Sequence, residues 1–340
     1  MNKTIIFLLV LFACAQEETI QIGIIAPLTG PAADLGALYV EGAQVAVDDL
    51  NAKNFLDKPI TLVIEDTGSD AKNAVTAMHK LTQVDDVNFI MTIMSTHGLA
   101  LKPLANQYGV LLFGDVAHPN MTGDSLMVFR HSNIAEDEAK LIVSKARELN
   151  GTVGMLYSNE DFGQVFNRVA RNELDKQTSV SSEAYDLKGT DFRSEIEKVA
   201  DKDTVIVVGV GPAFNQILKQ LNELGYKGNI ITNLGFVISN SAQLGTAVDG
   251  IYYTDYSYTS LENWSEFVSK FKARFEKEPR ALHSISYGTV ELIAHGIKNS
   301  DETPKNVALF LHGRIIEGTF EKMQVTEKGD VSLPLVMNQY

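Results

Sequence analysis

Short, continuous apolar runs alternate with stretches of helical periodicity along most of this chain. Residues 20–26 (IQIGIIA) are rich in β-branched side chains, as expected of a strand that is buried on both faces of a parallel sheet. After it, apolar side chains recur at helical spacing at Val40, Ala43, Val47 and Leu50. Further strands are predicted at residues 60–65, 89–93 and 110–113, with helices that begin near residues 70 and 99. This alternation predicts an α/β fold with a parallel sheet.

The alternation starts again after residues 128–133. The predicted strands of this second unit lie at residues 153–157, 180–185, 204–208, 229–232 and 250–254. The predicted helices lie at residues 136–149, 164–174, 192–199, 213–224, 264–276, 286–297 and 307–311. Two units of similar rhythm, without a low-complexity linker, predict two doubly wound lobes. A ligand is then expected in the cleft between them, beyond the carboxyl ends of the strands.

Composition and charge exclude several classes of partner. The chain has 340 residues, enough for two lobes of ordinary domain size, and its 45% apolar and 21% charged residues are typical of a globular protein. A net charge of −14 argues against nucleic acid and against adsorption to anionic lipid, because both require clustered Lys and Arg. Cys14 is the single cysteine, so disulfides within the chain and cysteine-ligated zinc are excluded.

The N-terminus has the pattern of a secretory signal. Lys3 precedes an apolar run over residues 5–13. This run is too short to span a bilayer, because a membrane-spanning helix needs about 20 apolar residues. Cys14 follows a small residue and thus resembles the lipidated cysteine of a bacterial lipobox. We expect residues 1–13 to be a signal peptide, Cys14 a lipid anchor, and residues 14–18 a tether on the extracytoplasmic side of the membrane. The alternative is an apolar N-terminal strand that happens to contain a cysteine.

Motifs for catalysis are missing from the sequence. There is no phosphate loop, G-x-S-x-G or H-E-x-x-H pattern, and the glycine pair Gly209 and Gly211 lacks the third glycine of a dinucleotide fingerprint. We therefore expect no cofactor, no metal and no enzymatic activity. Residues 95–98 (STHG) follow a predicted strand and precede a helix, which suits either an anion site or an ordinary helix cap. Residues 114–119 occupy the equivalent place after the next strand.

The sequence after residue 19 resembles the type I periplasmic binding proteins that serve ABC transporters for branched-chain amino acids and amides. The order and spacing of several short motifs carry this resemblance: residues 24–31 (IIAPLTGP), Gly36, 42–43, 46–52 (AVDDLNA), 65–66, Asp70, 74–75, 95–96, 159–163 (NEDFG), 189–192 (GTDF), 216–218 (QIL), Gly225, Tyr287 and 329–330. The resemblance implies two Rossmann-like lobes joined by three crossovers near residues 132, 256 and 319. One lobe would combine residues 19–132 with 257–318, and the other 133–256 with 319–340.

The family's ligand contacts can be transferred to matching positions. The resemblance implies that Ser95 binds the ligand carboxylate with Thr96 beside it, and that the loop holding Asp115 and Ala117 meets the ligand's carboxylate and ammonium. Further ligand-binding positions are Leu35 in a side-chain pocket, Phe162 as a cover from the second lobe, and Val210 and Leu234.

Ala117, Val210 and Leu234 depart from the amino-acid binders, and Ala117 lacks the hydroxyl that those proteins commonly place there. Amino-acid binders tend to carry a tyrosine where this chain has Val210, and an ammonium-pairing glutamate where it has Leu234. The pocket is therefore expected to be more apolar on the second-lobe side. This favours a small carboxylate, an amide or an aromatic acid over a standard amino acid as the ligand. An amine ligand stays an alternative because of Asp115.

The resemblance implies a substrate-binding lipoprotein of an ABC importer. Such a protein would trap a small solute, either an amino acid, an amide or a small or aromatic carboxylate, and deliver it to the permease subunits in the membrane. It would be a monomer, bind no nucleic acid and touch the membrane only through its lipid anchor. The alternative is a standalone ligand sensor that acts through a partner protein.

Overall fold

The computed structural model describes residues 18–174, 180–256, 264–319, 322–331 and 333–340. The expected signal peptide (residues 1–13), Cys14 and residues 15–17 of the expected tether lie outside this part of the chain. Within the described ranges, no helix combines the length and the apolar character needed to cross a bilayer.

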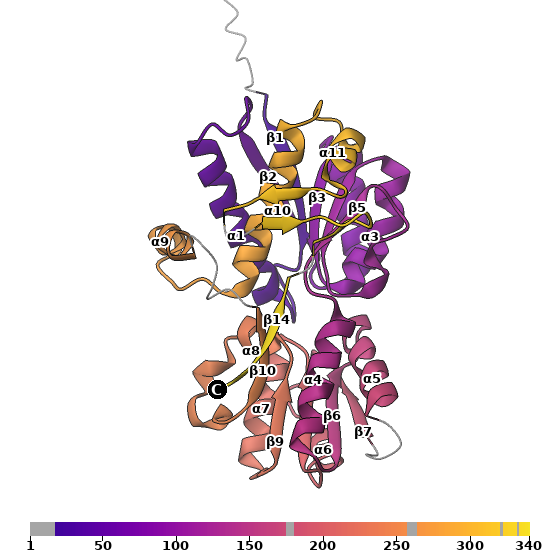
Figure 1. The fold of residues 1–340 in the computed structure, drawn as a ribbon, viewed down its shortest axis with the longest axis vertical. Helices are drawn as coiled ribbons and strands as arrows, with labels where there is room; N and C mark the ends of the chain where they lie inside the picture. Colours follow the sequence, from indigo (N-terminus) through magenta and orange to yellow (C-terminus); the bar gives the residue numbers. More distant parts are fainter. Residues whose placement is uncertain (1–17, 175–179, 257–263, 320–321, 332) are drawn as a thin grey trace, which may run out of the picture.

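The chain forms two lobes, each built around its own sheet (Figure 1). Among the described residues, the sheet of the first lobe has six parallel strands in the order β13–β5–β4–β3–β1–β2. These strands are β1 (Ile20–Ala26), β2 (Ile60–Asp66), β3 (Phe89–Ile93), β4 (Leu111–Asp115), β5 (Val128–His131) and β13 (Asp330–Val331). Strand order reverses between β1 and β3, which is the topological switch point of a doubly wound sheet.

The sheet of the second lobe has the same winding. Its order among the described residues is β14–β10–β9–β8–β6–β7, parallel except for the antiparallel edge strand β14. The strands are β6 (Val153–Ser158), β7 (Val180–Tyr185), β8 (Thr204–Val208), β9 (Asn229–Thr232), β10 (Tyr252–Tyr256) and β14 (Leu335–Gln339). The two Rossmann-like lobes predicted from the sequence are confirmed.

Helices cover both faces of each sheet. The first lobe carries α1 (Ala33–Ala52), α2 (Ala71–Gln83), α3 (Ser95–Tyr108), the 3-10 helix η1 (Pro119–Met121), α9 (Trp264–Phe275), α10 (Ala281–Lys298) and α11 (Pro304–Leu311). The second lobe carries α4 (Ala135–Leu149), α5 (Asp161–Glu173), α6 (Arg193–Glu197), α7 (Gly211–Glu223), α8 (Gly235–Ile238) and the 3-10 helix η2 (Ser241–Val248). A small antiparallel pair, β11 (Ile315–Glu317) and β12 (Lys322–Gln324), lies on the first lobe (Figure 1).

The central strands are apolar throughout because both of their faces are covered. Ile22 and Ile24 belong to the core formed with α1 and α10, whereas Ile25 belongs to the core formed with α2 and α3. In the second lobe, Met155 packs with α4 and α5, and Leu156 packs with α6 and α7. Consecutive side chains point to opposite faces of a sheet, so a continuous apolar run satisfies both cores.

The C-terminal segment returns to the first lobe before it reaches the second. The sequence places residues 319–340 in the second lobe, but β13 pairs in parallel with β5 of the first sheet. The guanidinium of Arg130 donates to the Asp330 carboxylate at 2.6 Å, and Arg130 is buried. This ion pair holds the segment on the first sheet, so the change of sheet lies between Val331 and Leu335 rather than near residue 319.

Helices α1 and α10 approach so closely that their contact point requires glycine. A Cβ atom at Gly42 would lie 2.1 Å from the backbone carbonyl oxygen of His283 on α10. Gly98 on α3 also faces a packed neighbour, but the nearest atoms are side-chain atoms of Met121 and Val116 at 3.1 Å. The first contact involves rigid backbone, whereas the second involves side chains that can move.

We expect Gly42→Ala to destabilise the protein, because the two helices must separate to admit the new methyl group. The expected loss is about 2 kcal/mol of unfolding free energy, since overpacking typically costs about 1–3 kcal/mol. Gly98→Ala is the matched control and should change stability by less than about 1 kcal/mol, because helix propensity favours alanine. Urea denaturation followed by circular dichroism measures both. Equal midpoints for Gly42→Ala and the parent would contradict the close contact.

Candidate functional site

A cavity of about 110 Å³ lies between the two lobes. The first lobe lines it with the segments that follow β1, β3 and β4 and with the start of α10. The second lobe contributes the segments that follow β6, β8 and β9. Its volume is of the same order as a cavity of about 150 Å³ that holds benzene. The carboxyl ends of both sheets therefore meet at a space that fits a small molecule.

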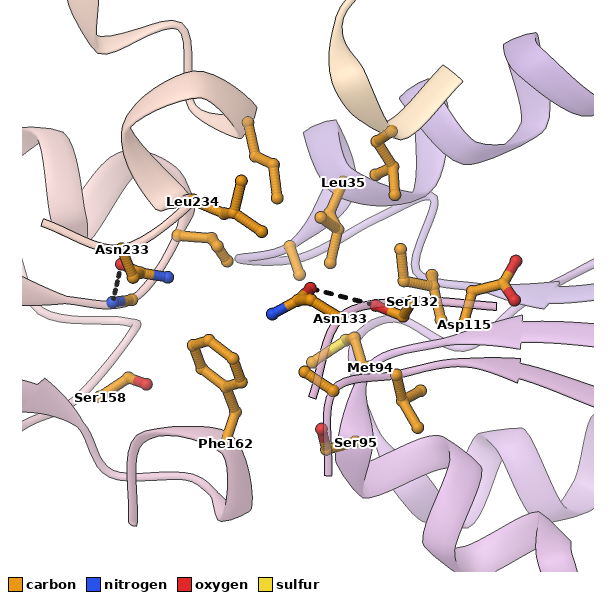
Figure 2. A pocket seen from close by; sticks show the side chains of 18 of the residues that line it. Leu35, Met94, Ser95, Asp115, Ser132, Asn133, Ser158, Phe162, Asn233 and Leu234 are labelled. Carbon is orange, nitrogen blue, oxygen red and sulfur yellow. Dashed lines mark hydrogen bonds between the residues drawn. The ribbon is translucent and has the colours of Figure 1, made fainter. Parts of the chain in front are cut away.

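Most of the predicted ligand-binding residues border this cavity. Those that line it are Leu35, Ser95, Asp115, Ala117, Phe162, Val210 and Leu234, whereas Thr96 does not. Phe162 projects from the start of α5 into the space between the two lobes, as Figure 2 shows. The ring of Phe162 packs on Phe166 with 4.8 Å between centroids. The structure thus brings together residues that are far apart in the sequence.

Ser95 lies at the amino end of α3, directly after β3. The helix begins here rather than near residue 99, because Gly98 N–H already donates to the carbonyl of Met94. Met94 has a φ of 79°, an uncommon backbone conformation for a residue with a side chain. The first N–H groups of a helix lack acceptors within the helix, and its dipole is positive at that end. This edge of the cavity therefore suits a carboxylate.

The Asp115 carboxyl group points away from the cavity (Figure 2). Its Oδ2 atom accepts hydrogen bonds from Tyr39 at 2.5 Å and Thr289 at 2.7 Å inside the first lobe. Burial raises the pKa of Asp115 to about 7, although both of these hydrogen bonds act in the opposite direction. The Asp115 carboxylate is therefore held by side chains of helices α1 and α10 rather than directed at the cavity.

One wall of the cavity is apolar and is shared by both lobes. Leu35 and Leu282 come from the first lobe, and Leu234 and Ile238 come from the second. Leu234 and Leu282 belong to the core cluster that includes α1 and α10, and Leu35 packs against it, so this wall continues the interior of the first lobe. An apolar wall opposite an anion site suits a solute with an apolar body and a carboxylate head.

The second lobe also brings polar groups that the sequence analysis missed. Ser158, Asn233 and Glu160 line the cavity, and the first two are almost fully buried. The second-lobe side of the cavity therefore combines these polar groups with the apolar side chains of Phe162, Val210 and Leu234. Ser158 ends β6 and Asn233 directly follows β9, so each lies at the carboxyl end of a strand, as Ser95 does. That shared position is the signal that could have identified them.

Two further carboxyl groups border the cavity. Glu138 is fully buried and accepts from the Leu234 N–H at 2.7 Å, the Thr254 hydroxyl at 2.6 Å and the Asn133 amide at 2.8 Å. Burial raises its pKa. Glu160 is partly exposed, and burial together with Asp161 and Asp186 raises its pKa as well. Within the described residues, no group of three His, Cys, Asp or Glu side chains could hold a metal ion.

Two similar lobes around a central cavity define a two-lobed solute-binding protein. A family model described as "Periplasmic binding protein" matches residues 19–329. The chain therefore belongs to the periplasmic binding protein family, and its fold is that of the type I members. Members of this family bind solutes and are not enzymes, which confirms the expectation from the sequence.

Individual relatives agree with this assignment. The Leu/Ile/Val/Thr-binding protein of Salmonella typhimurium is 23% identical over 93% of this chain and 90% of its own length. The Leu/Ile/Val-binding protein BraC3 of Rhizobium johnstonii is 26% identical over 94% of this chain and 91% of its own. These relatives confirm the predicted resemblance to the binding proteins for branched-chain amino acids.

Solved structures share the fold across almost the whole chain. The substrate-binding protein LivJ of Streptococcus pneumoniae, in complex with isoleucine, has a TM-score of 0.84 at 22% identity and covers 94% of this chain and 95% of its own. A solute-binding protein of an ABC transporter from Rhodopseudomonas palustris, in complex with 3,4-dihydroxybenzoic acid, also has a TM-score of 0.84, at 18% identity. It covers 94% of this chain and 93% of its own.

We expect Asp115 to make stability fall with rising pH. Its pKa of about 7 in the folded protein exceeds the value of about 3.9 in an unfolded chain, so the folded state binds the proton more tightly. This stabilisation is full below about pH 4 and is lost as the pH rises to about 7. Relative to the parent, Asp115→Asn should gain about 4 kcal/mol of unfolding free energy between about pH 4 and pH 8.

The measurement is urea denaturation across this pH range. Asp301→Asn is a control of opposite sign, because hydrogen bonds from the Thr303 side chain and backbone lower the pKa of Asp301. Its removal should cost more stability at the higher pH. Parallel pH profiles for Asp115→Asn and the parent would show that Asp115 has an ordinary pKa.

Proposed function

We propose that this chain is the extracytoplasmic solute-binding component of an ABC importer. The observation that carries the proposal is the cavity between the lobes, with the amino end of α3 on one side and an apolar wall on the other. A solute that contacts both lobes stabilises the closed form, because those contacts exist together only when the lobes meet. The closed form then docks on the permease subunits in the membrane and releases the solute.

The proposed solute carries a carboxylate and a small apolar or aromatic body. The carboxylate lies at Ser95 and the first N–H groups of α3, where charge and free donors favour an anion. The apolar body packs on Leu35, Leu234 and Leu282, and Phe162 covers it from the second lobe. The ligands named for the two solved structures, isoleucine and 3,4-dihydroxybenzoic acid, both have these two parts.

We expect Ser95→Ala to weaken solute binding by about 10- to 100-fold. A hydrogen bond to a charged group contributes about 1.5–3 kcal/mol, and its loss leaves the carboxylate with fewer donors. Thr96→Ala is the matched control, since Thr96 adjoins Ser95 on α3 but does not line the cavity. It should change the affinity by no more than about twofold.

The measurement begins with a thermal-shift screen of protein that has been unfolded and refolded to remove carried-over solute. The panel contains branched-chain amino acids, amides, and short and aromatic carboxylates, and calorimetry then gives the dissociation constant of each binder. A solute at a hundred times its dissociation constant adds about 2.7 kcal/mol of stability. Equal losses for Ser95→Ala and Thr96→Ala would place the carboxylate elsewhere. Silence across the panel would contradict the importer role and favour a sensor that acts through a partner.

We also propose that Cys14 carries the lipid that anchors the protein. Cys14→Ser should abolish incorporation of labelled fatty acid and release the protein from the membrane fraction, because no other cysteine is present. Solute affinity should stay unchanged, since Cys14 precedes the described lobes. Retention of the label in Cys14→Ser would contradict the anchor.

A further inference from the structure

Asn233 is a buried amide whose donor faces the cavity. It directly follows β9, is 1% exposed and lines the cavity. Its Oδ1 atom accepts the Gly209 N–H at 3.1 Å, whereas its Nδ2 atom has no hydrogen-bond partner among the described residues. Figure 2 shows this nitrogen directed toward the space between the lobes, on the side opposite Ser132 and Met94.

The orientation of this amide is set by its surroundings. The buried Gly209 N–H requires an acceptor, so the oxygen of Asn233 must face Gly209 and the nitrogen must face the cavity. The packing is also tight, because a Cβ atom at Gly235 would lie 2.9 Å from Asn233 Oδ1. The side chain therefore presents a fixed donor to the cavity rather than a choice of donor and acceptor.

Asn133 also lines the cavity with an amide side chain but, unlike Asn233, it has no free donor. Asn133 donates from Nδ2 to Glu138 at 2.8 Å, and its Oδ1 accepts from Tyr256 at 2.7 Å and Ser132 at 3.3 Å. Both of its polar atoms are used within the protein. Buried polar groups are generally hydrogen-bonded, so the free donor of Asn233 identifies a place where a solute atom completes the structure.

We propose that Asn233 determines which solutes the cavity selects, by donating a hydrogen bond to an acceptor oxygen of the solute. This inference rests on the proposed function, in which the carboxylate of the solute lies at Ser95. The cavity holds about 110 Å³, so the carboxylate and the second oxygen belong to one small solute. The solute class is therefore the oxo and hydroxy carboxylic acids, of which the 2-oxo and 2-hydroxy acids are the simplest, rather than amino acids, because an ammonium group has no lone pair to accept from Asn233.

The carboxyl groups that line the cavity also favour an oxo or hydroxy acid over an amino acid, because two of the three are already engaged within the protein. The Asp115 carboxyl points into the first lobe, and Glu138 already accepts three hydrogen bonds from the protein. Glu160 is the remaining carboxyl group of the described lining that could pair with an ammonium group. An amino acid would have to use Glu160 and would leave the Asn233 donor without an acceptor.

Four compounds with the same carbon skeleton test the inference. They are 4-methyl-2-oxopentanoate, 2-hydroxy-4-methylpentanoate, leucine and 4-methylpentanoate, and a second set has a phenyl group in place of the branched chain. The dissociation constants are measured by calorimetry on the refolded full chain near pH 7.5. We expect the oxo and hydroxy acids to bind at least about 10-fold more tightly than the other two, because only they supply the acceptor.

Variants at Asn233 connect that preference to the side chain. Asn233→Asp keeps the acceptor for Gly209 but replaces the donor with a carboxylate, so the oxo and hydroxy acids should lose their advantage of about 10-fold. Asn229→Asp makes the same chemical change at the other end of β9, outside the cavity lining, and should preserve the ranking. The ranking on the parent protein needs no variant, so the inference stays testable if Asn233→Asp fails to fold.

Each result decides between the alternatives. Tightest binding by leucine, weakened in Glu160→Gln, would make Glu160 an ammonium partner and overturn the role of Asn233. Equal binding of 4-methylpentanoate and the oxo acid, or an unchanged ranking in Asn233→Asp, would overturn it too. In these cases solute binding itself still holds. If no compound of either set binds, both the proposed carboxylate site and the inference are overturned.

Discussion

The buried carboxyl group of Glu138 is the interaction on which the two-lobed arrangement depends. It lies at the start of α4 and accepts hydrogen bonds from Asn133, from the Leu234 N–H and from Thr254. Asn133 lies between β5 of the first lobe and α4 of the second, and Thr254 lies on β10, the strand of the second lobe that precedes α9 of the first. The hydroxyl of Tyr256 donates to Asn133 Oδ1 at 2.7 Å and completes the network. Removing the carboxylate would leave several buried donors unpaired, which is costly.

The residues of this network lie near the hinge, which is where the chain passes from one lobe to the other, and they also form part of the cavity wall. Hydrogen bonds link Glu138 to Asn133 and to the Leu234 N–H, and Asn133 to Tyr256. All four residues also line the cavity. A solute that displaces any of these side chains therefore changes the geometry at the hinge. In the proposed function, closure and solute recognition are therefore coupled through direct contact, and a long-range pathway is not required.

The fold could largely be predicted because its signals are local. Strands such as β3 and β8 are covered on both faces, so their sequences are apolar without interruption. The strand β13 has only two residues and leaves no such pattern; its place depends on the ion pair between Arg130 and Asp330, which are distant in the sequence.

The site was predictable only in its location. Residues that follow the strand ends could be placed around a cavity, but side-chain direction depends on partners from other elements. Asp115 turns into the first lobe because Tyr39 and Thr289, on two different helices, donate to it. Asn233 faces the cavity because Gly209, on a neighbouring loop, requires an acceptor. Single-sequence patterns carry no information about such pairings.

The course of the chain between the lobes has a consequence for the order of folding. The strands β6 to β10 of the second lobe are consecutive in the sequence, so most of that sheet forms from contacts at short sequence separation. The first lobe is interrupted, because α1 packs against α10, which follows the whole of β6 to β10. Closing so long a loop costs entropy and slows assembly. The lobe at the amino terminus is therefore expected to be the last to mature.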